Sequence, residues 1–385
     1  MGRDVPRMNE TTSVFPPEKA AVLLVAESLR PGGMTTYARA LMKGLTAVGL
    51  APRLCAPDEP VPGFFPDAAR RQVHCFPALN AVVLRSLRMW GVAHWAREQR
   101  FALIHGLSSF SAPACQFLSG VLQIPYLLTV QHYQDRGDIR VDRGCRGVLA
   151  SSESIRENLV NDARVPKELI QVVPLGIELP PLLPRERTAG QRPVVTTCAP
   201  LTPMQDVATF VRAAREISTA LDGGCQFVIV GEGPEEHALR KLVRQLQLSH
   251  HVVFSHEGVS HDQVLRDTDV YVQTPRKEGF GFAVLEAMGH GRPVVSTSVG
   301  GLLSLVRDGQ TGYLVPPEQP AAIAEKVVAL LRDPVFCARM GEAARACVAK
   351  DYSMTAMIRR TVRLYASVLG LREQNGTGVF LARSL

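Results

Sequence analysis

Short apolar runs alternate with amphipathic segments of helical period along most of the chain, and this alternation occurs as two successive series. The first series covers residues 21–175 and the second covers residues 194–315. Consecutive Val, Ile and Leu residues are typical of strands that are buried on both faces, and intervening helices connect such strands in parallel. We therefore predict an α/β protein of two Rossmann-like domains, each a doubly wound parallel sheet.

Composition places the boundaries of these domains. A proline-rich, charged stretch separates the two series and suits an interdomain linker. The first and last residues lack apolar periodicity, so we expect flexible tails at both ends. The expected parts are a tail at 1–18, an N-terminal domain at 19–180, a linker at 181–193, a C-terminal domain at 194–350, a last helix at 351–371 and a tail at 372–385.

Charge and apolar content argue against several classes of protein. The chain has a net charge of +7, but no basic run with interleaved aromatic residues, so we expect no nucleic-acid partner. The longest early apolar run, Ala20 to Ala26, is far shorter than the roughly 20 residues that cross a bilayer. Glu27 and a Gly-Gly turn follow it, which favours a buried strand over a signal peptide. The eight cysteines form no C-x-x-C pair, as is typical of reduced thiols in a cytoplasmic protein.

The fold class itself predicts where a ligand binds. Parallel α/β sheets hold ligands beyond the carboxyl ends of their strands. We therefore expect the site in a cleft between the two domains, formed by the loops that follow the strands of both. These loops come after Leu29, Gln131, Cys198, Val230, Gln273 and Thr297.

The most informative of these loops begins at Glu278 and continues as Gly-Phe-Gly-Phe-Ala-Val-Leu to Glu286. Two glycines permit close approach of the backbone, and a helix is predicted to begin near Gly281. Free amides and the helix dipole suit an anion such as a diphosphate. The two carboxylates, eight residues apart, suit hydroxyl groups of a sugar and a ribose. A surface helix with solvated acids is the plainer alternative.

This stretch resembles the E-x7-E signature of the family-4 retaining glycosyltransferases, which have the GT-B fold. The resemblance continues through residues 291–297, 300–301 and 308–316. It implies retaining transfer of a sugar from a nucleotide diphosphate sugar, with neither a metal nor another cofactor. It also implies that the last helix returns to pack on the N-terminal domain. The residues that it assigns to donor sugar and diphosphate are Glu278, Gly279, Phe280, Gly281 and Phe282, and Glu286 is assigned to the ribose.

Two segments of the N-terminal half also match this family. Gly32 and Gly33 follow the first strand, where the family's loop closes over the donor phosphates; taken alone, they favour a plain turn. The family has Thr-x-His at the end of a later strand. This chain has Thr129-Val-Gln-His132, so the alignment puts Gln131 in the histidine's place. We expect a catalytic His132, although a one-residue shift at a strand end reverses the facing. His105 is the other candidate, and a satisfied histidine at a strand end is its plainer interpretation.

The chain departs from the family at the diphosphate. The family has an Arg and a Lys after the first strand of the donor domain, where this chain has Pro200 and Gln205. A charge-assisted contact is worth roughly 1.5–3 kcal/mol. Arg276 and Lys277, just before Glu278, are the candidates to replace them. The departure also raises an alternative: a degenerate member that binds nucleotide sugar or a partner without transferring.

Three further expectations concern metals and partners. We expect no metal at Asp267-Thr-Asp269, because this pair precedes its strand and so lies away from the site. Residues 81–97 mix arginines with two tryptophans and would suit a helix resting on the inner face of an anionic membrane. The alternative is a helix packed on the N-terminal sheet. The acceptor stays open as a carbohydrate, a lipid-linked molecule or a small molecule.

Overall fold

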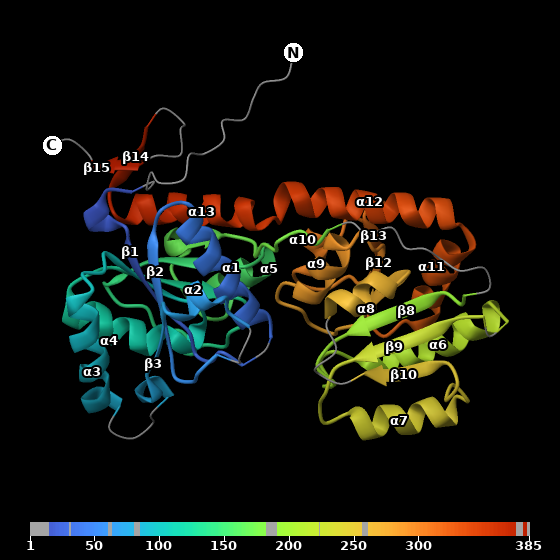
Figure 1. The fold of residues 1–385 in the computed structure, drawn as a ribbon. Helices are drawn as coiled ribbons and strands as arrows, with labels where there is room; N and C mark the ends of the chain where they lie inside the picture. Colours follow the sequence, from blue (N-terminus) through green and yellow to red (C-terminus); the bar gives the residue numbers. More distant parts are fainter. Residues whose placement is uncertain are drawn as a thin grey trace, which may run out of the picture. The chain divides into compact units, whose positions relative to one another are not determined.

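The computed structural model describes residues 15–30, 32–60, 64–80, 85–181, 191–222, 224–255, 261–374 and 380–382. They form two compact units (Figure 1). Unit 1 comprises the chain up to Ala150, Arg156–Val173 and the chain from Met354 onward. Unit 2 comprises Ser151–Ile155 and Pro174–Ser353.

Unit 1 is built on a seven-stranded sheet in the order β3-β2-β1-β4-β5-β6-β7, and every neighbouring pair is parallel. Its apolar strands are buried as the Val and Leu runs predict. The strands are β1 Ala21–Val25, β2 Ala51–Ala56, β3 Val73–Cys75, β4 Leu103–Gly106, β5 Tyr126–Val130, β6 Cys145–Ala150 and β7 Ile170–Val172. The helices are α1 Gly33–Ala47, α2 Asp67–Arg70, α3 Arg85–Glu98, α4 Ala112–Leu122, α5 Glu153–Asn161 and α13 Met354–Val368.

Unit 2 has a six-stranded parallel sheet in the order β10-β9-β8-β11-β12-β13. The strands are β8 Val194–Cys198, β9 Gln226–Val230, β10 Val252–Ser255, β11 Val270–Gln273, β12 Val294–Thr297 and β13 Gly312–Val315. The helices are α6 Val207–Ala220, α7 Glu236–Gln245, α8 His261–Asp267, α9 Phe282–Gly289, α10 Leu302–Leu305, α11 Pro320–Arg332 and α12 Pro334–Asp351. The prediction of two parallel Rossmann-like sheets is confirmed.

Each sheet has one point at which the strand order reverses. In unit 1 it lies between β1 and β4, and in unit 2 between β8 and β11. Loops that leave neighbouring strands at such a point diverge to opposite faces of the sheet and leave a crevice for a ligand. The carboxyl ends of these four strands are therefore the places to search for a site.

The helix α13 belongs to unit 1 and packs against α1 (Figure 1). The helices approach closely at Gly44, where any side chain would overlap with Ile358. A buried polar chain joins α13 to the sheet. The hydroxyl of Tyr365 lies 2.7 Å from Nδ1 of His105, and Nε2 of His105 lies 2.8 Å from Oγ1 of Thr129.

The described residues within the expected tails include two anchored segments. Leu371–Glu373 forms strand β14, which pairs antiparallel with β15 at Phe380–Ala382. Near the other end, Phe15 is buried and Lys19 donates from Nζ to the carbonyl of Leu369 at 2.8 Å. Composition alone misses such anchors because one buried side chain suffices to hold a short segment. Most of the linker at 181–193 lies outside the described residues.

Candidate functional site

In unit 2, two carbonyl groups of the turn between β11 and α9 accept hydrogen bonds from other segments. The backbone N–H of Gly301 donates to the carbonyl of Glu278 at 2.9 Å, and Oγ of Ser152 donates to the carbonyl of Gly279 at 2.6 Å. The carbonyl and the following N–H of a planar trans peptide point in opposite directions. The N–H of Phe280 therefore faces away from Ser152, toward the Glu278 carboxylate, with Oε1 at 3.4 Å.

Two glycines make this turn possible. Gly281 is the N-cap of α9 with φ 92° and ψ 52°, a left-handed conformation that favours glycine. A side chain at Gly301 would overlap with the backbone of Gly279. No side chain among the described residues caps α9. The first N–H groups of the helix have no intrahelical acceptor, so this end suits an anion.

The Glu278 carboxylate lies at the reversal point of the sheet. Its Oε2 accepts a hydrogen bond at 3.3 Å from Nε2 of Gln205, which comes from the loop after β8. Gln205 in turn contacts Gln273, the last residue of β11, at 3.0 Å. The two loops that diverge at the reversal point are thus joined through this carboxylate.

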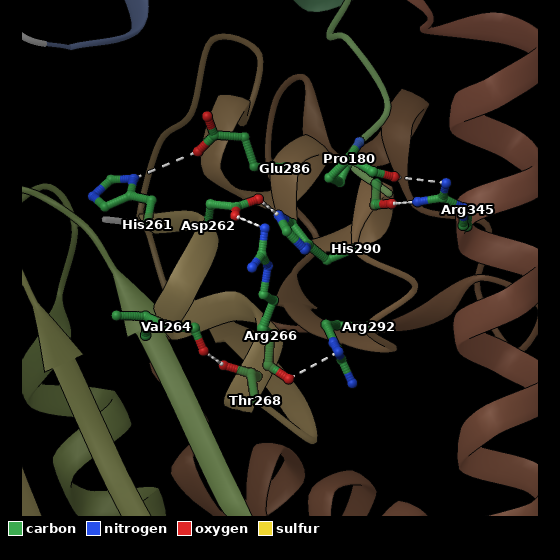
Figure 2. A network of polar contacts seen from close by, with 11 residues as sticks. Pro180, His261, Asp262, Val264, Arg266, Thr268, Glu286, His290, Arg292 and Arg345 are labelled. Atoms are coloured by element: carbon green, nitrogen blue, oxygen red, sulfur yellow. Dashed lines mark hydrogen bonds and ion pairs between the residues drawn. The ribbon is translucent and has the colours of Figure 1, made fainter. Parts of the chain in front are cut away.

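Glu286 lies in the second turn of α9, and its side chain is one-quarter exposed. Its Oε2 is 3.5 Å from Nδ1 of His261, the first residue of α8 (Figure 2). Burial raises the pKa of Tyr271 well above its usual value, and the negative charges of Glu286 and Glu278 raise it further.

Polar contacts hold the C-terminal end of α9, as Figure 2 shows. Nε2 of His290 lies 3.1 Å from Asp262, and burial lowers the pKa of His290. Arg345 of α12 donates to the carbonyls of Gly289 and Pro180. A cation at the C-terminus of a helix is favourable to its dipole. The helix is held at its carboxyl end, and its amino end carries the glycine turn.

The guanidinium group of Arg276 forms ion pairs with two carboxylates. Its Nη2 lies 2.8 Å from Oε1 of Glu318, and its Nε lies 3.6 Å from Oδ2 of Asp206. Lys277 is exposed, and so is Pro200 in the place of the family's arginine. The two cations proposed for the diphosphate thus directly precede Glu278, but one of them already has anionic partners.

In unit 1, Gly32 and Gly33 stand at the N-terminus of α1. Gly32 has φ 149° and ψ 178°, a conformation that is open almost only to glycine. The hydroxyl of Thr35 donates to the carbonyl of Arg30. At the reversal point of the same sheet, Oγ of Ser108 donates to Oε2 of Glu27 at 2.6 Å.

Gln131 and His132, just after the end of β5, differ in their exposure to solvent. His132 is exposed, whereas Gln131 is buried. Nε2 of Gln131 has no hydrogen-bond partner among the described residues. His105 is fully buried with both ring nitrogens bonded, and burial lowers its pKa to about 3. A neutral, fully bonded His105 has a structural role.

Two further segments concern membranes and metals. The ring of Trp95 on α3 packs against His74, Phe76 and Phe101, with centroids 4.5, 5.2 and 5.7 Å away. Residues 81–84 of the proposed membrane segment lie outside the described residues, and among those described no helix is long and apolar enough to cross a bilayer. Asp269 accepts a hydrogen bond from the N–H of Val194 at 2.7 Å, at the amino end of the sheet.

Sequence reasoning missed several members of the site. Ser152 acts on the glycine turn from a distant part of the chain, and Glu318 neutralises Arg276. A weak signal existed for Gln273, since it is a polar residue at the end of an otherwise apolar strand. No signal pointed to the contact between His261 and Glu286.

Comparison with known structures and families defines the class. The fold is similar to that of HepE from Anabaena, solved with UDP and glucose, with a TM-score of 0.77 and 18% identity over 90% of this chain and 100% of that one. A sucrose-phosphate synthase from Thermosynechococcus elongatus gives a TM-score of 0.74 and 19% identity over 91% of this chain and all of that one. Unit 1 and unit 2 thus have the two sheets of the GT-B fold.

Two family models match in succession: "Glycosyltransferase Family 4" over residues 31–179 and "Glycosyl transferases group 1" over residues 183–346. The chain belongs to the family-4 glycosyltransferases. An N-acetyl-alpha-D-glucosaminyl L-malate synthase from Bacillus anthracis is 31% identical over 43% of this chain and 42% of the relative. An alpha-D-kanosaminyltransferase from Streptomyces kanamyceticus is 33% identical over 48% of each chain. The chain thus spans less than half the length of these two relatives. A D-inositol 3-phosphate glycosyltransferase from Arthrobacter is 26% identical over 81% of this chain and 85% of its own.

Proposed function

We propose that this protein is a retaining glycosyltransferase that moves a sugar from a nucleotide diphosphate sugar to an acceptor hydroxyl, without a metal or another cofactor. The observation that carries the proposal is the Glu278 carboxylate, held between Gln205 and the N–H of Phe280 beside the uncapped amino end of α9. One place thus offers acceptors for sugar hydroxyls and donors for phosphate oxygens.

Each residue has a role in this proposal. The amides of Gly279–Phe282 receive the diphosphate, because N–H groups at a helix start stabilise an anion. Glu278 accepts hydrogen bonds from the sugar, and Glu286 accepts them from the ribose. Arg276 and Lys277 add positive charge for the leaving group. Within unit 1, Gly32 and Gly33 are proposed for phosphate binding, and Gln131 or His132, at the end of β5, is proposed for catalysis.

The chemistry follows from these roles. The bond between the anomeric carbon and the diphosphate oxygen breaks, and the acceptor oxygen forms a new bond to that carbon on the same face. The leaving diphosphate takes the acceptor's proton. Donors that are already oriented toward the departing oxygen stabilise its growing charge without further reorganisation.

Known proteins suggest the first donor to test. HepE has been solved with UDP-glucose, at 18% identity and a TM-score of 0.76. The names of the relatives include acceptors as different as L-malate and D-inositol 3-phosphate, so they do not single out one acceptor. Membrane contact through residues 81–97 forms no part of the proposal, because the Trp95 ring packs against Phe76 and Phe101.

The test is a thermal-shift screen of UDP-, GDP- and ADP-sugars, followed by transfer or hydrolysis assays. A ligand at 100 times its Kd adds about 2.7 kcal/mol to the free energy of unfolding, which is an easily measured rise in melting temperature. Stabilisation and turnover with one donor support the proposal. Stabilisation without turnover of any donor would replace it with the second candidate.

That second candidate is a degenerate family member that binds nucleotide sugar and does not transfer. Neutral residues at 200 and 205 favour it, as do the two carboxylates already paired with Arg276. Replacing both Arg276 and Lys277 with alanine separates the two. The active enzyme should lose about 10-fold or more in kcat/KM, since a charge-assisted contact to phosphate is worth roughly 1.5–3 kcal/mol. The degenerate protein should bind the nucleotide sugar nearly as before.

A further inference from the structure

Four side chains of unit 2 form one hydrogen-bonded line. The hydroxyl of Tyr271 donates to Oε1 of Gln273 at 2.6 Å. Nε2 of Gln273 donates to Oε1 of Gln205 at 3.0 Å, and Nε2 of Gln205 donates to Oε2 of Glu278 at 3.3 Å. The line starts at a fully buried tyrosine of β11 and ends at the carboxylate that begins the glycine turn.

In this line, each donor lies on the Tyr271 side of its hydrogen bond and each acceptor on the Glu278 side. A carboxylate only accepts hydrogen bonds, whereas each amide has one accepting oxygen and one donating NH2 group. Gln205 must therefore turn its NH2 group to Glu278 and its oxygen to Gln273. Gln273 must then turn its own oxygen to Tyr271, which donates. The charge on Glu278 fixes the orientation of both amides, and the buried tyrosine hydroxyl anchors the far end.

All three supporting groups are neutral. Gln205 is neutral and lies near the position at which the family resemblance expects a lysine, and Arg276, on the same loop as Glu278, lies between Asp206 and Glu318. A lysine at 205 would place a positive charge close to the Glu278 carboxylate, because the Gln205 side chain already reaches Oε2 at 3.3 Å. The amide groups instead orient the carboxylate through their dipoles. They add no positive charge at position 205.

We propose that Gln205 and Gln273 are positioning residues that act through Glu278 and set the affinity for the sugar part of the donor, as opposed to its nucleotide part. This inference rests on the proposed function. Glu278 is the group assigned to the sugar, while the nucleotide is assigned to the amides of α9 and to Glu286. Breaking the line should therefore weaken binding of a nucleotide sugar and leave binding of the bare nucleoside diphosphate unchanged.

The experiment measures both affinities by calorimetry, with UDP and UDP-glucose, and with GDP and GDP-mannose as a second pair. The variants are Gln205→Met, Gln273→Met and their combination, since Met keeps the length of the side chain and removes both polar groups. We expect the nucleotide sugar to bind about 10-fold more weakly to each, with the bare nucleotide within twofold of the wild type. The double variant should lose no more than the stronger single variant, because either break interrupts the same line. Gln245→Met, on an exposed position of α7, is the matched control.

Equal loss for nucleotide and nucleotide sugar, or strictly additive losses, would overturn the inference. A wild-type protein that binds neither nucleotide would instead remove the proposed function. The ligand-free crystal structure of Gln205→Met then decides the inference by itself. A Glu278 carboxylate displaced from its wild-type position supports the positioning role, and an unmoved carboxylate rejects it.

Discussion

The two units each contain a buried polar chain that starts at a tyrosine, and the chains end differently. In unit 1, Tyr37, Thr129, His105 and Tyr365 follow one another at 3.0, 2.8 and 2.7 Å, and both end groups are buried tyrosines. In unit 2, the chain from Tyr271 ends at the partly exposed Glu278. The first chain is closed and the second is open.

The difference separates stability from binding. A closed chain satisfies every one of its members, so its contribution goes into holding α1, the sheet and α13 together. An open chain leaves its last member with spare acceptor capacity, which a ligand completes. Removing one partner from a buried hydrogen bond leaves the other unsatisfied, at a cost of about 1–3 kcal/mol. Damage to the closed chain should therefore appear as unfolding, and damage to the open chain as lost activity.

The largest effect should come from His105→Leu. It leaves the buried Tyr365 hydroxyl without its His105 partner and removes one of the two hydrogen bonds of Thr129, so we expect a loss of about 2–4 kcal/mol in the free energy of unfolding. Both tryptophans of the chain lie on α3 of unit 1, so urea unfolding followed by tryptophan fluorescence reports this unit. The kcat/KM of the folded variant should stay within twofold of the wild type; a large loss there would mean that the chain is not closed.

At the end of the open chain, Glu278→Gln should lower activity and leave the free energy of unfolding nearly unchanged. The amide keeps the shape but loses the charge that accepts hydrogen bonds from sugar hydroxyls, so kcat/KM should fall about 10- to 100-fold. The free energy of unfolding should change by less than about 0.5 kcal/mol. Glu342→Gln, an exposed position of α12, is the control. Full activity of the Glu278 variant would contradict the proposed role.

Acid should act on the closed chain. Burial holds the pKa of His105 at about 3, whereas the unfolded side chain titrates near 6.5, so the unfolded state binds more protons between these values. Stability is therefore complete above pH 6.5 and is lost as the pH falls. Between pH 7.5 and 5.0 the wild type should lose about 2 kcal/mol more than His105→Gln. Urea unfolding at both pH values measures this, and parallel losses in the two proteins would exclude His105 as the cause.

A smaller effect should distinguish Gln131 from His132. The buried amide of Gln131 has an unsatisfied N–H group among the described residues, while His132 is exposed. If the end of β5 meets the substrate through the buried group, Gln131→Ala should lower kcat several-fold and His132→Ala less than twofold. Steady-state kinetics with the identified donor make the comparison. The reverse order would restore His132 as the catalytic residue.

Much of the fold was predictable because it follows from local patterns. Runs such as Val270–Gln273 are too apolar for an exposed strand, and the helices between such runs dictate parallel pairing. The glycine turn was predictable for the same reason, since a glycine permits the left-handed conformation that Gly281 adopts before α9. These features depend on neighbours in the sequence.

The remainder depends on contacts between distant segments. Gln205 and Glu278 are 73 positions apart, and only the pairing of β8 with β11 brings their loops together. The neutralisation of Arg276 by Glu318 has the same origin. The exposure of His132 was not predictable from the sequence either, because a shift of one residue at the end of a strand turns a side chain to the opposite face of the sheet.

Unit 1 is formed by segments that are far apart in the chain, and this affects the order in which the two units can be completed during synthesis. Unit 2 is nearly continuous in the chain, whereas His105 meets its partner only when Tyr365 emerges, about 190 residues after Val173. At roughly 5–20 residues per second, the ribosome needs about 10–40 s to cover that distance. During that interval the first sheet to be synthesised lacks the Tyr365 partner of His105 Nδ1 and the helix α13 that packs on α1, so the domain that begins first is the last to be completed.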